Sequence, residues 1–224
     1  MTSTADKALR ADESTVERME HSEIPTDFLE WQRSARTSLF RTVVTGGSES
    51  VKSMPCHLAV LGSLRPDGTI NLATKGVGLV PKEERIADFT GSFKVALKDA
   101  NGASWESSLE RRMKTLLMFY GEIDNFDNTK LGGLEIFEGA TYANLRNEPR
   151  ASLLFTDGPP AFRSYEIEGT VEFVDPGNPH FEFLLAAREL FARDSFHVPQ
   201  NAYPHGFVFH VSKVRDKRPF TRRR

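Results

Sequence analysis

The feature that most constrains the fold is a pair of strand-like segments separated by a tight turn. Residues 56–64 form one strand-like segment and residues 69–80 form another, with Arg65-Pro66-Asp67-Gly68 between them. Proline presets the backbone angle φ and glycine tolerates positive φ, so this tetrapeptide predicts a reversal of the chain. The glycines of the second segment predict a bulge or a close approach of its backbone to another segment.

Further strand-like segments follow along the chain. Residues 165–173 alternate apolar side chains with glutamate and threonine, which is typical of a half-buried strand. Further strands are expected over 85–90, 151–155 and 206–215. Strands do not alternate with helices as they do in a doubly wound parallel sheet. We therefore expect a mainly β (α+β) fold, a small antiparallel barrel with peripheral helices, because closure removes exposed strand edges.

Three helices are expected around this barrel. The first begins near Pro25, where apolar residues start to recur at three- and four-residue steps, and Asp27 with Glu30 is a candidate capping pair. A short helix is expected over 141–146. A third opens at Asn178-Pro179, because asparagine caps helices and proline fits their first turn.

The length of 224 residues suits one domain. Residues 1–24 are polar and lack apolar periodicity, so we expect a mobile N-terminal arm there. The domain is expected over 25–215, followed by a basic tail over 216–224.

Charge and composition narrow the class of protein. Lysine and arginine number 29 against 31 acidic residues, a net charge of −2 that argues against a nucleic-acid partner. No apolar run approaches the roughly 20 residues that span a bilayer, and the first residues show no secretory leader. Cys56 is the only cysteine, and we expect it to be an inert packed residue. The histidines lack the spacing of metal ligands, so no metal is expected. We expect a cytoplasmic protein with neither membrane nor nucleic-acid partners.

Four stretches carry a resemblance to a known family. They are the hairpin 57–76, the segment 88–92, the segment 141–155, and Gly158-Pro159-Pro160 with the strand that ends over 168–174. In this order they resemble the pyridoxamine 5′-phosphate oxidase-like, FMN-binding split β-barrels. The resemblance covers most of residues 56–212. It implies a six-or-so-stranded antiparallel split β-barrel, an FMN cofactor and a homodimer whose interface holds that cofactor.

The resemblance also implies which residues hold FMN. The dianionic phosphate requires cations and short hydroxyl or backbone donors, and the flavin ring would take hydrogen bonds from a strand backbone. The flavin itself carries the redox chemistry, so no catalytic residue is assigned. The implied residues are Lys75, Thr90, Gly91, Ser92 and Thr141 at the phosphate, and Asn71, Leu72, Ala73 and Thr74 at the ring.

Two features depart from the family pattern. Residues 93–139 separate segments that lie close together in the most similar branch of the family. We interpret them first as an inserted surface element packed through its aromatic side chains, with a lid over the cofactor or an arm around a second subunit as the alternatives. Many relatives have lysine or arginine where this chain has Thr141, so a phosphate contact there would come from a hydroxyl.

The expected function is that of an FMN-dependent oxidoreductase, which moves a hydride between the flavin and a small organic substrate. The alternatives are a flavin-binding protein without catalysis, a relative that binds haem or a deazaflavin, and a dimer that has lost its cofactor site. Oxidation of pyridoxamine phosphate itself is disfavoured, because residues 215–220 lack the Arg-x-His pattern of the true oxidases.

Overall fold

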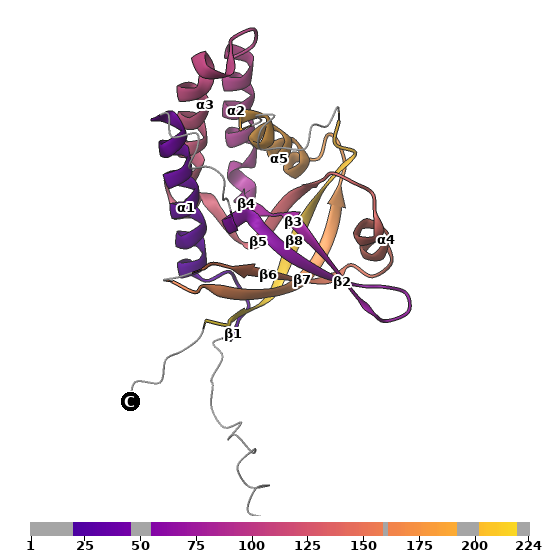
Figure 1. Ribbon diagram of the computed structural model, residues 1–224. Coiled ribbons are helices and arrows are strands. Elements are labelled where there is room, and N and C mark those ends of the chain that lie inside the picture. The colour runs from indigo at the N-terminus through magenta and orange to yellow at the C-terminus, as the bar shows by residue number, and fades with distance from the viewer. Residues whose placement is uncertain (1–19, 46–54, 159–160, 192–201, 219–224) are drawn as a thin grey trace, which may run out of the picture.

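The computed structural model describes residues 20–45, 55–158, 161–191 and 202–218. One antiparallel sheet forms its centre, and helices cover the sheet at one end (Figure 1). The strands run in the order β3-β2-β6-β7-β8-β5-β4, and the short strand β1 pairs with β8. Their bounds are β1 Glu20–His21, β2 Leu58–Leu64, β3 Ile70–Gly76, β4 Gly78–Pro81, β5 Phe126–Glu135, β6 Arg150–Thr156, β7 Ser164–Val174 and β8 His205–Asp216.

The sheet curls back on itself. β3 and β4 stand at opposite ends of the strand order, yet only Val77 separates them in the sequence. The two ends of the sheet must therefore meet there. A Cβ atom built on Gly133 of β5 would lie 2.3 Å from the carbonyl oxygen of Gly76, so glycine is required where the backbones approach. This antiparallel half-barrel is consistent with the expected split barrel. The backbone at Gly76 does approach another segment, but the glycine that this approach requires is Gly133, since a Cβ atom on Gly76 would meet nothing within 4 Å.

Four helices gather at one end of the sheet and the fifth lies apart from them (Figure 1). Phe119, which is 1% exposed, joins the two layers, because its ring contacts Phe93 and Phe183 of the helices and Phe126 of β5. The short helix α4 packs instead against β2 and β3. The helices are α1 Thr26–Val44, α2 Ile86–Asp99, α3 Trp105–Tyr120, α4 Ala140–Asn147 and α5 Pro179–Leu190, with 3-10 turns at Pro55–His57, Glu83–Arg85 and Ile123–Asn125.

Most of the predicted elements are confirmed. The hairpin forms with Leu64 opposite Ile70, and Arg65 receives a hydrogen bond from the amide of Gly68, whose φ is 81°. The predicted strands near 151–155, 165–173 and 206–215 correspond to β6, β7 and β8. The helix over 141–146 corresponds to α4, and Asn178 caps α5 by accepting a hydrogen bond from the amide of His180 at 2.9 Å.

The strand predicted over 85–90 is wrong. These residues form a 3-10 turn and the start of α2. Ile86, Phe89, Phe93 and Ala96 are buried at three- and four-residue steps, which is the spacing of one helix face. Six residues taken alone were too short a window to show this period. The helix α3 was not predicted either. Helices therefore make up a larger part of the molecule than the expected mainly β fold implied.

The surface element predicted over 93–139 is also wrong. This segment contains most of α2, all of α3 and the strand β5, which lies inside the sheet between β8 and β4. Phe93 and Phe126 are at most 2% exposed. The segment therefore builds the core rather than lying on it.

The chain ends and the first helix differ from expectation as well. α1 follows Pro25 without a side-chain cap, so Asp27 and Glu30 do not form the capping pair; Asp27 instead accepts hydrogen bonds from Tyr165 and Arg218. Residues 20–24 belong to the fold, since β1 pairs with β8 and the Ile24 amide donates to Asn128. Residues 1–19 and 219–224, the rest of the predicted arm and tail, lie outside the described residues.

Candidate functional site

A buried polar cluster joins the hairpin to α4. The side-chain amide of Asn71 on β3 donates to the Thr141 hydroxyl at 3.0 Å and to the Ser63 hydroxyl of β2 at 3.4 Å. Asn144 donates to the same Ser63 hydroxyl at 3.4 Å. Thr141 and Asn144 share one face of α4 because they are three residues apart. All four residues are at most 8% exposed.

An arginine of the hairpin turn extends this cluster to the surface. The exposed Arg65 donates to the Ile70 carbonyl oxygen at 2.7 Å and to Oδ1 of Asn71 at 3.2 Å. The turn beneath it is fixed by Asp67, which accepts hydrogen bonds from the amide and hydroxyl of Thr69; these bonds lower the pKa of the Asp67 carboxyl. Arg65 therefore places a guanidinium beside the amide that bonds Thr141.

The first turn of α4 adds further donors beside Thr141. Gly139 is the N-cap residue, and no side chain caps the helix. The amide groups of a first helical turn lack intrahelical acceptors and carry partial positive charge, which favours an anion. Arg65, the Thr141 hydroxyl and these amides thus form a donor set of the kind that binds a phosphate group.

Lys75 lies on the same face of β3 as Asn71 but is already paired. Its Nζ atom lies 2.5 Å and 2.7 Å from the two carboxylate oxygens of Glu135 on β5. The Glu135 side chain is 1% exposed, so the ion pair closes the interior between β3 and β5. The charge of Lys75 is thereby offset within the fold.

The residues expected at the flavin ring lie at the edge of the sheet. β3 ends the strand order, so one side of its backbone has no strand partner among the described residues. Leu72 and Thr74 point outward, and Leu72 is 67% exposed, while Ala73 is half-buried on the other face. A free strand edge offers N–H and C=O groups to a planar, hydrogen-bonding ring.

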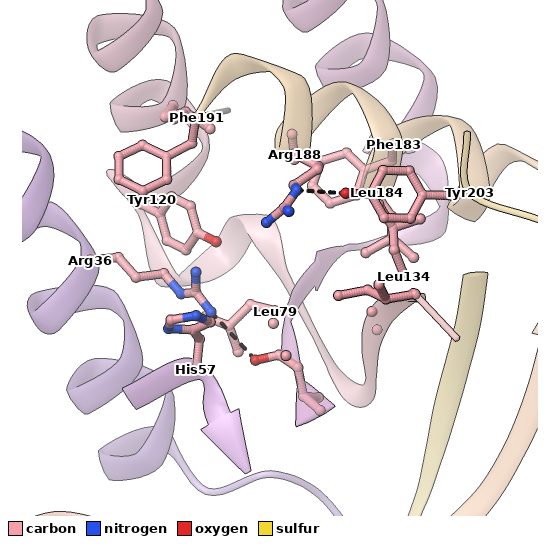
Figure 2. A pocket seen from close by; sticks show the side chains of 18 of the residues that line it. Arg36, His57, Leu79, Tyr120, Leu134, Phe183, Leu184, Arg188, Phe191 and Tyr203 are labelled. Atoms are coloured by element: carbon pink, nitrogen blue, oxygen red, sulfur yellow. Dashed lines mark hydrogen bonds between the residues drawn. The ribbon is translucent and has the colours of Figure 1, made fainter. Parts of the chain in front are cut away.

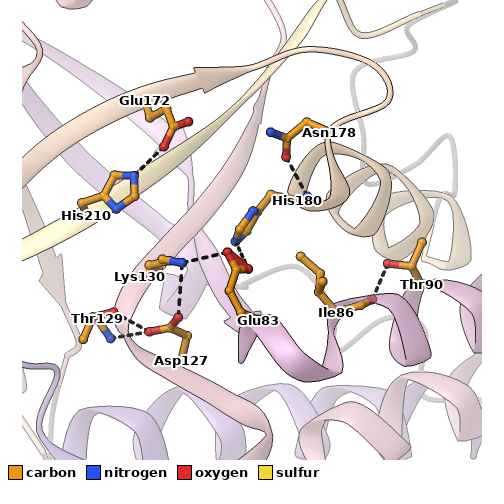
Figure 3. Close-up of polar contacts among 10 residues, drawn as sticks. All are labelled: Glu83, Ile86, Thr90, Asp127, Thr129, Lys130, Glu172, Asn178, His180 and His210. Carbon is orange, nitrogen blue, oxygen red and sulfur yellow. Dashed lines mark hydrogen bonds and ion pairs between the residues drawn. The ribbon is translucent and has the colours of Figure 1, made fainter.

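The structure does not bring Thr90, Gly91 and Ser92 to this site. They lie on α2, where Gly91 and Ser92 are exposed and the Thr90 hydroxyl donates to the Ile86 carbonyl oxygen at 2.7 Å (Figure 3). Within the described part of the chain, no hydrogen bond or ion pair connects them with Lys75 or Thr141. The Thr-Gly-Ser segment was placed by resemblance, but in this chain a helix carries it. These three residues are therefore left out of the candidate site.

Sequence reasoning missed Ser63, Arg65, Asn144 and Glu135. Arg65 and Asn144 stand inside the stretches that carry the resemblance, so a search for polar side chains in those stretches would have included them. No comparable signal marked Glu135, since its pairing with Lys75 depends on the curl of the sheet.

Three further observations concern chemistry other than cofactor binding. Burial raises the pKa of the Cys56 thiol, in agreement with an inert packed cysteine. Over residues 20–45, 55–158, 161–191 and 202–218, no group of three histidine, cysteine or acidic side chains is placed to hold a metal ion. Among these residues there is also no helix with the length and apolarity needed to cross a membrane.

Comparisons with known proteins give only distant structural likenesses. No family model matches the chain, and no curated protein matches it. Similar solved structures include an FMN-binding protein from Syntrophomonas wolfei (9% identity, 87% of this chain and 95% of that one, TM-score 0.43) and HupZ from Group A Streptococcus (15%, 72% and 86%, 0.40). Another is a protein from Listeria innocua named as a candidate pyridoxamine 5′-phosphate oxidase (11%, 72% and 88%, 0.41). At these TM-scores the likenesses carry no inference about function, which has to rest on the site.

Proposed function

We propose that this protein is an FMN-dependent oxidoreductase that transfers a hydride between the flavin and a small organic substrate. The observation that carries the proposal is the 3.0 Å contact between Asn71 and Thr141. These residues stand in two separate stretches that resemble the FMN-binding family, and the resemblance assigns each of them to the cofactor. Their meeting is what a shared cofactor site requires.

The phosphate group of FMN fits the donor set at the start of α4. Arg65 supplies a positive charge, Thr141 a hydroxyl and the uncapped first turn its amides. Hydrogen bonds to a charged group are the strong ones, about 1.5–3 kcal/mol each. Lys75 contributes less than the sequence suggested, because Glu135 already neutralises it.

The ring of FMN fits the free edge of β3. Backbone groups there would bind the polar side of the ring, and the exposed Leu72 would contact its apolar part. When bound, the flavin supplies the capacity to accept or give a hydride. The chain contributes position: β3 fixes the ring, and α4 with Arg65 fixes the phosphate.

A second copy of the chain would cover the cofactor. One face of the β3-β2-β6 part of the sheet exposes a continuous group of apolar side chains, and a Cβ atom on Gly62 would touch Leu72 at 3.5 Å. Exposed apolar patches of this kind mark interaction surfaces. We assign the face to a homodimer interface. Its residues are Leu58, Val60, Leu64, Ile70, Leu72 and Leu154.

FMN titration tests the cofactor site. Wild-type protein should quench FMN fluorescence with a Kd of about 1 μM or tighter, and Arg65→Met should weaken binding about 10- to 100-fold, the equivalent of one charge-assisted hydrogen bond. Arg146→Met is the matched control, because Arg146 is an exposed arginine at the other end of α4. Equal affinities for the two variants, or no binding by wild type, would contradict the proposal. If the purified protein shows the absorption spectrum of haem or of a deazaflavin, that cofactor and not FMN occupies the site.

Light scattering during size exclusion tests the interface. Leu72→Asp should convert a dimer into a monomer and weaken FMN binding, because one face carries both roles. Val95→Asp is the control, since Val95 is 59% exposed on α2, away from this face. A wild-type monomer at concentrations of tens of micromolar would refute the assignment of the interface.

A further inference from the structure

A second potential binding site lies between the helices and the sheet, in a cavity of about 190 Å³ (Figure 2). α1, α3 and α5 form its upper walls, and the junction of β3 with β4 and the end of β5 form its floor. Its walls are largely aromatic and apolar, with Phe40, Tyr120, Phe183, Leu184 and Phe191 among them. None of the residues predicted for FMN lines it.

Two arginines face this cavity from helices far apart in the sequence. Arg36 comes from α1 and Arg188 from α5, and Figure 2 shows both guanidinium groups directed at the space between the helices. Arg36 donates to the Val77 carbonyl oxygen at 3.4 Å, while its Nε atom is buried without a hydrogen-bond partner. Arg188 donates through Nε to the Tyr203 hydroxyl at 2.9 Å.

Neither guanidinium pairs with a carboxylate in the part of the chain that the structure describes. Other half-buried arginines do have such partners, such as Arg33 with Glu30 and Arg218 with Asp216. Two positive charges at one apolar cavity repel each other and lose hydration, which is unfavourable unless an anion joins them. An anion placed between them would offset both charges.

The rest of the lining indicates what the anion carries. The Tyr120 ring lies 5.4 Å from the Arg36 guanidinium, and burial raises the pKa of its hydroxyl, which therefore stays protonated and able to donate. The remaining aromatic walls suit an apolar body rather than a polyhydroxylated one. A cavity of about 150 Å³ holds a benzene molecule, so this space suits one ring or a branched chain of similar size.

We propose that this cavity binds a small organic acid, with its carboxylate between Arg36 and Arg188 and its apolar body against Phe40, Phe183 and Phe191. Guanidinium groups match the two oxygens of a carboxylate by paired hydrogen bonds, which makes arginine the appropriate residue. The proposal is independent of the flavin, because the cavity residues are distinct from those assigned to FMN.

Calorimetric titration with benzoate tests the proposal, and benzyl alcohol serves as the uncharged probe of the same size. Benzoate should bind at least tenfold more tightly than benzyl alcohol. Arg36→Met and Arg188→Met should each weaken benzoate binding at least tenfold, and Arg41→Met should not, since Arg41 is an exposed arginine of the same helix as Arg36. Binding of the two probes with equal affinity, or an unchanged benzoate affinity in Arg36→Met, would overturn the proposal.

Two further measurements keep the result separate from protein stability and from FMN. If either methionine variant is unfolded by circular dichroism, Arg36→Lys and Arg188→Lys replace it; they keep the charge and lose the paired geometry, so benzoate should bind more weakly than to wild type. Benzoate should also raise the melting temperature of the wild-type protein, and benzyl alcohol at equal concentration should raise it less. Both results are expected in protein free of flavin, so failure of FMN binding would leave them unchanged.

Discussion

The curl of the sheet depends on Gly133, and replacing it with alanine tests whether the two ends of the sheet meet as described. The added Cβ atom would lie 2.3 Å from the Gly76 carbonyl oxygen and 2.7 Å from the Phe207 ring. Ordinary van der Waals contact begins near 3.4 Å, so the β3 and β5 backbones have to separate by about 1 Å. The oxygen belongs to the backbone and cannot rotate away as a side chain would.

The cost follows from this geometry. Overpacking a core costs about 1–3 kcal/mol, and contact with backbone places Gly133→Ala at about 3 kcal/mol. In domains of about 150–250 residues, each 1 kcal/mol shifts the melting temperature by about 2–4 °C, so the variant should melt about 6–12 °C below wild type. Scanning calorimetry or circular dichroism at 222 nm measures the change.

Gly91→Ala is the matched control, because the same methyl group is added at an exposed helical position with no atom within 4 Å. Alanine is favoured over glycine inside a helix by about 0.5–1 kcal/mol, so this variant should melt a few degrees above wild type. A Gly133→Ala protein that melts within 2 °C of wild type would refute the close approach of β3 and β5. A lower melting temperature for Gly91→Ala would refute the helix assigned to residues 86–99.

Two further predictions concern buried charge. Glu135→Gln leaves the Lys75 ammonium without its carboxylate, so the free energy of unfolding measured by urea titration should fall by about 3–5 kcal/mol. The double variant Lys75→Met, Glu135→Leu should recover most of that loss. Equal losses in the single and double variants would contradict the buried ion pair. His180 is 8% exposed and 3.6 Å from Glu83 (Figure 3), and desolvation lowers its pKa below the usual 6.5. At position 180 the unfolded chain therefore takes up a proton more readily than the native protein. The stability that depends on neutral His180 is fully present above about pH 6.5 and is lost as the pH falls through the native pKa. The midpoint of urea unfolding should decline less steeply with falling pH in His180→Gln than in wild type, and an equal decline would show that other groups cause it.

The sequence predicted those elements whose signal is local. The turn at 65–68, the alternation over 165–173 and the cap at Asn178 each occupy a few consecutive residues, and each is confirmed. The same reasoning failed over 85–90, because six residues do not distinguish a strand from the first turns of a helix whose buried face extends to Ala96. The aromatic residues over 93–139 were visible, but whether they pack on the surface or in the core depends on segments elsewhere in the chain.

The candidate site shows the same division. Asn71 and Thr141 were identified from the sequence stretches in which they stand, whereas their contact, and that of Arg65 with Asn71, required the packing of α4 on the hairpin. Lys75 was assigned to the FMN phosphate and is instead paired with Glu135. Neither Arg36 nor Arg188 was identified from the sequence as a binding residue.

Residue order by itself determined the antiparallel hairpins, the caps and the types of side chain available to bind a ligand, because these depend on neighbours within a few positions. Only the tertiary structure decided that the sheet curls until Gly76 meets Gly133, and that two arginines from opposite parts of the chain face one cavity. The physical reason is that contacts between residues far apart in the sequence depend on how the helices pack on the sheet. No local periodicity in the sequence encodes the distance between such residues.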